Sequence, residues 1–363
     1  MDLIKTEMTP KARLMGYAMG KEVDRIPIIL IFGDTSPPLY GYKIRDYYAS
    51  ADMMVEIETN LARDYGSDSM GIGVGLRGIA EALGTKLKYP EDRISYVHEP
   101  VITDLKQVGS MDLVDVEKDG NLSVVMSANA RLQEKFGDTH FIGCGIAGPV
   151  TTATALYGVT PFLKDSIKNP EGIHTLLRYS TDNIIKCIRD MCKKIPTGFS
   201  IAEPVITTDV MSPKLFAAFA EPYIKEVISA ITETIGQKPS IHFCGHTKGR
   251  WPFIKEWPVS SFSVDNCESL LELKNECGQR FTIAGNVSPV DTLLGGTPGE
   301  VEEAVKKCLL DGADSPRGFI LATGCQISVG TPKDNITAMA NAAAIYGKGA
   351  KVGQHPIGMR DYM

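Results

Sequence analysis

The sequence predicts an α/β fold built on a parallel sheet, either closed into a barrel or doubly wound. Short β-rich runs alternate with amphipathic helical stretches nearly from end to end, which is the pattern of repeated strand–helix units. We find no linker, low-complexity tract or fixed-period repeat in the sequence, so one domain is expected. The eight predicted strands are Pro27–Gly33, Ser69–Val74, Phe141–Gly145, Phe199–Glu203, Ser240–Cys244, Ser261–Asp265, Phe281–Asn286 and Phe319–Thr323.

Capping residues mark where helices begin between these strands. Ser212 is a good N-cap, and Pro213 falls at the first helical position, where the missing N–H of proline costs nothing. Pro222, further along the same helical stretch, predicts a kink. Thr297 and Glu300 form a capping box at the start of another helix. The wider spacing of the first strands predicts insertions between them.

Composition narrows the class of protein. With 363 residues, of which 43% are hydrophobic and 23% charged, the chain can bury a large core. The net charge of −6 and the scattered basic residues argue against a nucleic-acid partner. The longest apolar runs, such as Ile28–Phe32, are far shorter than the roughly 20 residues that span a bilayer, and we identify no signal peptide. A cytoplasmic protein with reduced cysteines is therefore expected.

The strongest chemical pattern is a histidine and two cysteines at predicted strand ends. His242 and Cys244 are two residues apart, so on a strand both side chains point to the same face. Gly245 then ends the strand. Cys325 follows the last predicted strand at the same relative height, and in a barrel these ends meet at one rim. His246, in the following loop, is an alternative to His242 as a ligand, and simple packing remains an alternative for the whole group.

Three nitrogen and sulfur ligands are typical of a catalytic rather than a structural zinc site. They leave one position of tetrahedral Zn²⁺ open. A substrate thiol bound there would lose its proton at neutral pH, because the metal favours thiolate. Alternatively, the zinc would act as a Lewis acid on the oxygen of a methyl donor.

Other polar residues follow predicted strands at the same rim. Glu203, Asp265 and Asn286 end three of the strands, and Asp209 lies a few residues beyond Glu203. At these positions polar side chains usually serve the pocket, so Glu203, Asp265 and Asn286 are predicted catalytic residues. They could orient substrate, support His242 or supply a displaceable fourth zinc ligand. The alternative is that they cap nearby backbone or helix ends.

From Thr9 onward the chain resembles the uroporphyrinogen decarboxylase superfamily. The resemblance rests on KARLMGYAMGKEVDRIPI, GCGIAGPVTTATALYG, SPKLFAAFAEPYIKEV, IHFCGHT, IAGNVSPVDTLLGGTPGEVEEAV and GCQISVGTPKDNITAMANAAAIYG. It implies a (β/α)₈ barrel over residues 1–363, with an N-terminal helical extension, and so favours the barrel over the open sheet.

Within that superfamily the chain looks more like the corrinoid-dependent methyltransferases. Their zinc motif, H-x-C followed by a distant cysteine, is matched by His242, Cys244 and Cys325. The decarboxylases have a histidine at the position of Cys325, an arginine in the segment that here reads IPIILIFGDTSPPLYG, and an essential aspartate near the position of Gly75. These three departures argue against porphyrinogen decarboxylation, which remains the alternative function.

This resemblance implies a partner protein that carries a corrinoid. The expected function is zinc-dependent transfer of a methyl group between that corrinoid and a small molecule, either a thiol acceptor of the coenzyme M type or a methylated or methoxylated donor. A third possibility is that the chain itself carries the corrinoid, because DTHFIG, with His140, fits a cobalt-ligating signature. The downstream S-x-L of that signature is absent from its expected place. GVGLRG matches a nucleotide-binding pattern, but a barrel turn also needs glycine there.

Overall fold

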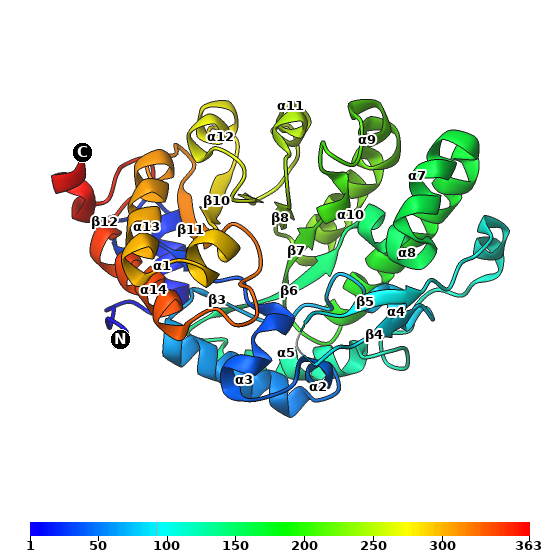
Figure 1. The fold of residues 1–363 in the computed structure, drawn as a ribbon, viewed down its shortest axis with the longest axis horizontal. Helices are drawn as coiled ribbons and strands as arrows, with labels where there is room; N and C mark the ends of the chain where they lie inside the picture. Colours follow the sequence, from blue (N-terminus) through cyan, green and yellow to red (C-terminus); the bar gives the residue numbers. More distant parts are fainter. Residues whose placement is uncertain (92) are drawn as a thin grey trace.

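The computed structural model describes residues 1–91 and 93–363. At its centre, eight parallel strands follow one another in chain order around a barrel, with helices outside them (Figure 1). The strands are β2 (Ile28–Ile29), β3 (Ser69–Met70), β6 (Phe141–Ala147), β7 (Gly198–Ala202), β8 (Ser240–Phe243), β9 (Ser261–Val264), β10 (Thr282–Val287) and β11 (Phe319–Thr323). All eight lie within the predicted strand regions or within two residues of them, and the first two are much shorter than predicted. The predicted barrel is confirmed.

The barrel closes between its two shortest strands, β2 and β3. The backbone N–H of Asp68, just before β3, donates to the carbonyl of Ile28 at 2.8 Å. The carboxylate of Asp68 accepts from the N–H of Ile28 at 2.8 Å, so this residue extends the pairing that the short strands cannot make. Asp68 is fully buried, and the guanidinium groups of Arg13 and Arg25 both bind it. A buried carboxylate is tolerated here because cations pair with it.

Helices lie between successive strands and after the last one, and they cover the outside of the barrel (Figure 1). Ser212 caps α9, and Thr297 with Glu300 forms a capping box on α13, both as predicted. The kink predicted at Pro222 is a complete break, because α9 ends at Phe219 and α10 begins at Glu221. Proline has no N–H to continue α9, whereas the first turn of a new helix tolerates it. The covering helices are α3 (Ala51–Tyr65), α5 (Leu122–Phe136), α6 (Pro149–Tyr157), α7 (Val159–Lys168), α8 (Pro170–Cys192), α9 (Pro213–Phe219), α10 (Glu221–Ile235), α11 (Trp251–Ile254), α12 (Leu270–Cys277), α13 (Pro298–Gly312) and α14 (Lys333–Tyr346).

The remaining elements lie before the barrel, after it, or in the predicted insertions between its first strands. Within the described residues, no helix is both long and apolar enough to cross a bilayer. β1 pairs with β12 in antiparallel fashion, which joins the two ends of the chain. β4 pairs with β5, also antiparallel, and the two form a hairpin between β3 and β6. These elements are α1 (Pro10–Ala18), β1 (Val23–Arg25), α2 (Ile44–Tyr47), α4 (Gly78–Ala82), β4 (Lys86–Lys88), β5 (Tyr96–Glu99) and β12 (Lys348–Ala350).

The strands pack large side chains outward and small ones inward. Phe243 and Phe262 are fully buried beneath the covering helices. On the inner face Ser200, Ser240 and Ser261 lie side by side in register on β7, β8 and β9. In most barrels of this type, bulky branched residues fill the interior. Here glycine, serine and alanine occupy many of these positions, so the interior is hollow. This hollow is the cavity described below.

Candidate metal centre and barrel cavity

The structure brings His242, Cys244 and Cys325 together at the carboxyl ends of the strands. His242 is near the end of β8 and Cys244 directly follows that strand, while Cys325 follows β11. His242 Nε2 lies 3.2 Å from Cys244 Sγ, and the two Sγ atoms are 3.7 Å apart. One ligand atom from each residue lies within 4.8 Å of the other two. All three side chains are partly buried, so the arrangement could hold a single metal ion.

The hydrogen bond between Cys244 and Cys325 shifts the pKa values of the two thiols in opposite directions. The Cys244 hydrogen bond lowers the pKa of Cys325 to about 4, with His242 adding a hydrogen bond and a charge in the same direction. The pKa of Cys244 is raised, first by this hydrogen bond, then by burial and by the charge of Cys325. The hydrogen bond between the two sulfurs therefore favours a thiolate at Cys325 beside a thiol at Cys244. A metal ion would displace the remaining proton, because metals bind cysteine as thiolate.

His242 is oriented by its neighbours on both adjacent strands. Its Nδ1 lies 3.0 Å from Ser263 Oγ on β9, and the two residues are paired in register. Its backbone carbonyl accepts from the N–H of Glu203, at the end of β7, at 3.0 Å. With Nδ1 engaged, Nε2 faces the sulfurs. Such a contact fixes the ring and is typical of metal-binding histidines.

Asp265 and Asn286 hold the loops around these ligands. Asp265 Oδ2 accepts from the N–H of Gly245 at 2.8 Å, directly after Cys244. Asn286 Nδ2 donates to the carbonyls of Asp265 at 3.0 Å and Glu268 at 2.7 Å. Gly245 has φ of 67°, a conformation that glycine adopts without strain. Both predicted residues therefore support the loops next to the candidate metal ligands, and direct participation in catalysis stays a prediction.

Glu203 lies close to the centre, but its carboxylate points to a helix. It is fully buried and accepts from the N–H groups of Val150 at 2.8 Å and Thr151 at 3.0 Å, in the first turn of α6. The Thr151 hydroxyl donates to it at 2.6 Å. Burial raises the pKa of Glu203 to about 7, against the opposing effect of these hydrogen bonds. Glu203 thus caps α6 and supports His242 through its backbone, while a catalytic role is still a prediction.

The alternative ligand, His246, lies outside the group of three. Its Nδ1 contacts Asp209 Oδ2 at 2.8 Å, and its side chain is 59% exposed. His140 directly precedes β6, at the amino end of the barrel, with its Nδ1 2.9 Å from Thr139 Oγ1. In the GVGLRG segment, Gly73 lies so close to β6 that an added Cβ would be 2.7 Å from a carbonyl oxygen. Close backbone packing thus explains this glycine.

A cavity of about 980 Å³ extends from the metal centre through the hollow barrel. His242 and Ser263 line it beside the centre, and the small inward residues of β6 to β9 line its middle. Its volume is at the upper end of the range for sites that bind drug-sized ligands. Glu58, on the inner side of α3, is 8% exposed and also lines it. Burial raises the pKa of Glu58 to about 7, against the opposing effect of a hydrogen bond from Gly71 N at 3.4 Å.

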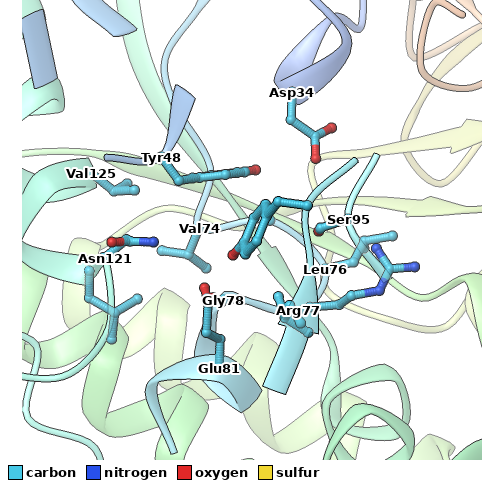
Figure 2. Close-up of a pocket in the computed structure, with 14 residues that line it drawn as sticks. Asp34, Tyr48, Val74, Leu76, Arg77, Gly78, Glu81, Ser95, Asn121 and Val125 are labelled. Atoms are coloured by element: carbon cyan, nitrogen blue, oxygen red, sulfur yellow. The ribbon is translucent and has the colours of Figure 1, made fainter. Parts of the chain in front are cut away.

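Three residues at the cavity mouth were missed by the sequence reasoning. Asp34 and Arg77 come just after the first two predicted strands, so the strand-end argument used for Asp265 could have found them. Gln326 follows Cys325, and its amide donates to Asp34 Oδ1 at 2.8 Å, which ties that cysteine's loop to the loop after β2. Figure 2 shows Asp34, Tyr48 and Arg77 around a smaller recess of about 30 Å³. Glu58 could not have been found in this way, because it lies on helix α3 and not at the end of a predicted strand.

Comparisons with known proteins show which enzymes this chain resembles. The chain is 26% identical over 350 residues to a methylcobamide:CoM methyltransferase of Methanosarcina barkeri, covering 94% of this chain and 99% of that protein. It is 23% identical to a uroporphyrinogen decarboxylase of Prochlorococcus marinus, covering 89% of this chain and 93% of that protein. The solved structure of a methyltransferase from Methanosarcina mazei superimposes with a TM-score of 0.82 at 26% identity, covering 93% and 98%. The two methyltransferases among these relatives support an enzyme of methyl transfer.

The family itself follows from a match along most of the sequence. The family model for uroporphyrinogen decarboxylase (URO-D) matches residues 9–346, which include all eight barrel strands and the three candidate metal ligands. The resemblance inferred from the sequence motifs is thus confirmed, and the chain belongs to the uroporphyrinogen decarboxylase family.

Proposed function

We propose that this protein is a zinc-dependent methyltransferase that moves a methyl group between the corrinoid of a partner protein and a small molecule. The observation that carries the proposal is the convergence of His242, Cys244 and Cys325, whose ligand atoms lie within 4.8 Å of one another beside a large cavity. The relatives that are methyltransferases support the same class of reaction.

The donor set fits zinc. Two cysteine sulfurs and one imidazole are common zinc ligands, and three protein ligands leave a fourth position for a reactant. His242, Cys244 and Cys325 would hold the ion. When bound, zinc would supply either a deprotonated substrate thiol at neutral pH or polarisation of a methyl donor.

The surrounding residues prepare this centre. Ser263 holds the imidazole, and Asp265 fixes the turn after Cys244. Asn286 fixes the loop that carries Asp265. We retain the proposal that Glu203, Asp265 and Asn286 serve catalysis, with the contacts above supporting a positioning role. The fourth ligand would come from the substrate or from one of these side chains.

The proposed partner is a separate corrinoid protein, and we place the reaction in the cytoplasm. One relative is named for methylcobamide and CoM, and another, from Methanosarcina mazei, is a methylated-thiol–coenzyme M methyltransferase. Both directions of transfer are part of the proposal: from methyl-cobalt to a thiol, or from a methylated or methoxylated compound to reduced cobalt.

The first experiment measures zinc. The purified protein is expected to hold about one zinc ion per chain, and Cys244→Ala and Cys325→Ala are expected to lose it. Cys192→Ala is the matched control, because Cys192 is a partly buried cysteine on α8, outside the group of three. A folded protein that never binds zinc, or cysteine variants that keep it, would reject the centre.

The second experiment measures methyl transfer. The enzyme is mixed with a corrinoid protein in the cobalt(I) state and candidate methyl donors, and the absorption spectrum is followed. Appearance of the methyl-cobalt spectrum fixes both chemistry and direction. The alternative function, decarboxylation, is supported by the decarboxylase relatives and is tested directly with uroporphyrinogen, for which no turnover is expected. If instead the chain carried the corrinoid itself, the protein alone would bind cobalamin with histidine ligation.

A further inference from the structure

Among the residues that the structure describes, Arg77 is an unpaired cation at the mouth of the barrel cavity. Its side chain is partly buried and lines both the large cavity and the adjoining recess. Across residues 1–91 and 93–363, its guanidinium forms no ion pair and donates no hydrogen bond. The more deeply buried Arg13 and Arg25 both bind Asp68. None of its nitrogens is a buried atom closed off from solvent, so its donors are open to water or to a ligand that enters the cavity.

The acids nearest to Arg77 are already engaged. Asp34 accepts a hydrogen bond from the amide of Gln326 at 2.8 Å. Burial raises the pKa of Asp34, and the charge of Arg77 opposes this rise although the two side chains form no ion pair within the described residues. Glu81, across the recess, accepts a hydrogen bond from the hydroxyl of Tyr89. In Figure 2 the guanidinium of Arg77 lies at the edge of the recess, away from Glu81. Neither acid therefore satisfies the donors of Arg77.

We propose that Arg77 binds a carboxylate group of the small-molecule substrate. This inference rests on the proposed function, because it places the reacting end of the same molecule at the metal centre. Arg77 and His242 line one continuous cavity, so a single elongated molecule can contact both. The planar guanidinium fork matches the two oxygens of a carboxylate.

The size and charge of the recess favour a carboxylate over a larger oxyanion. Its volume of about 30 Å³ has room for about two water-sized atoms, so a compact anionic group such as a carboxylate fits there. The neighbouring acids Asp34 and Glu81 disfavour a group with more than one negative charge. The expected substrate class is therefore a monocarboxylate with a thiol or methylated heteroatom at its other end.

The test measures the affinity of thiols whose chain length increases stepwise. Zinc-loaded protein is titrated calorimetrically with straight-chain ω-mercaptocarboxylates and, for each length, with the matching ω-mercaptoalcohol. At one chain length the acid is expected to bind about tenfold or more tightly than the alcohol, the effect of one charged hydrogen-bonded pair. Arg77→Gln should abolish this preference and leave both zinc content and alcohol affinity unchanged. Arg77→Lys should restore part of it, and Arg63→Gln, at an exposed arginine, should have no effect.

The possible failures can be told apart. Equal binding of acids and alcohols at every length, or a preference that survives Arg77→Gln, overturns the subsite, while the thiol binding itself upholds the metal centre. A preference for ω-mercaptosulfonates over the acids overturns the carboxylate assignment. If the protein takes up no zinc, the proposed function fails, and the subsite is judged by the binding of hexanoate and hexanol to the metal-free protein, measured by ligand-observed NMR. There, hexanoate binding that Arg77→Gln removes supports the subsite, and its absence in the unmodified protein overturns it.

Discussion

Replacing Glu58 with glutamine is expected to stabilise the protein above neutral pH. Glu58 is 8% exposed and lines the barrel cavity from α3. Its carboxylate accepts one hydrogen bond, from Gly71 N at 3.4 Å, and within the described residues it pairs with no cation. Burial raises its pKa to about 7, and the Gly71 hydrogen bond opposes this rise. A buried carboxyl group without a cation favours its neutral form.

The magnitude follows from the two pKa values. A rise from 4.5 to about 7 corresponds to about 3 kcal/mol, at about 1.4 kcal/mol for each tenfold change in proton affinity. The folded state holds the Glu58 proton more tightly than the unfolded chain does. The stability that this proton contributes is therefore complete below pH 4.5 and is lost as the pH rises to about 7. Because glutamine does not ionise, Glu58→Gln should gain about 3 kcal/mol at pH 8 and almost nothing near pH 4.5.

Urea unfolding of both proteins between about pH 5 and pH 8 measures this difference. Subtracting one pH profile from the other cancels groups that titrate alike in both, including the metal ligands. The control is Glu56→Gln, two residues away on the exposed face of α3, where the profile should parallel that of the unmodified protein. If the Glu58→Gln variant were no more stable at pH 8, or if the difference did not change with pH, the reasoning about its buried charge would be wrong.

Three further variants test the support of the site and the barrel. Ser263→Ala should weaken zinc binding about tenfold in chelator competition, because the hydroxyl no longer holds the imidazole, whereas Ser261→Ala, on the same strand face, should leave it unchanged. Gly245→Ala should lower the free energy of unfolding by more than the roughly 1–2 kcal/mol of backbone strain, since its Cβ would also press on a neighbouring loop. The control, Gly236→Ala, has open space around it and should show the strain alone. Equal losses in the two variants would contradict this reasoning. Asp68→Asn should cost about 3 kcal/mol or more in thermal unfolding, because two buried guanidinium groups lose their anion, and an unchanged Tm would refute that role.

Much of the local structure could be predicted from the sequence because local forces decide it. Short β-rich runs between amphipathic helical stretches place all eight strands, since the preference for strand or helix is set by local sequence. Ser212 and the Thr297–Glu300 pair mark helix starts because their side chains bind N–H groups only three residues away. His242 and Cys244 share a face for the same reason. Pro222 shows the limit of local reasoning, because the sequence indicates a disturbed helix but not whether it bends or breaks.

Contacts between distant residues depend on the tertiary structure, and the sequence could predict the meeting of Cys325 with Cys244 only on the assumption of a closed barrel. Cys325 lies 81 residues from Cys244, and the 3.7 Å between their sulfurs exists only because the sheet closes into a barrel. The carboxylate of Glu203 binds the first turn of α6, about fifty residues earlier in the chain, which no spacing rule predicts. Side chains from several elements also decide three further features: the hollow interior, the position of Glu58 facing it, and the position of Arg77 at its mouth. Local backbone preferences fix each strand and helix, whereas contacts between elements depend on the long-range packing that closes the barrel.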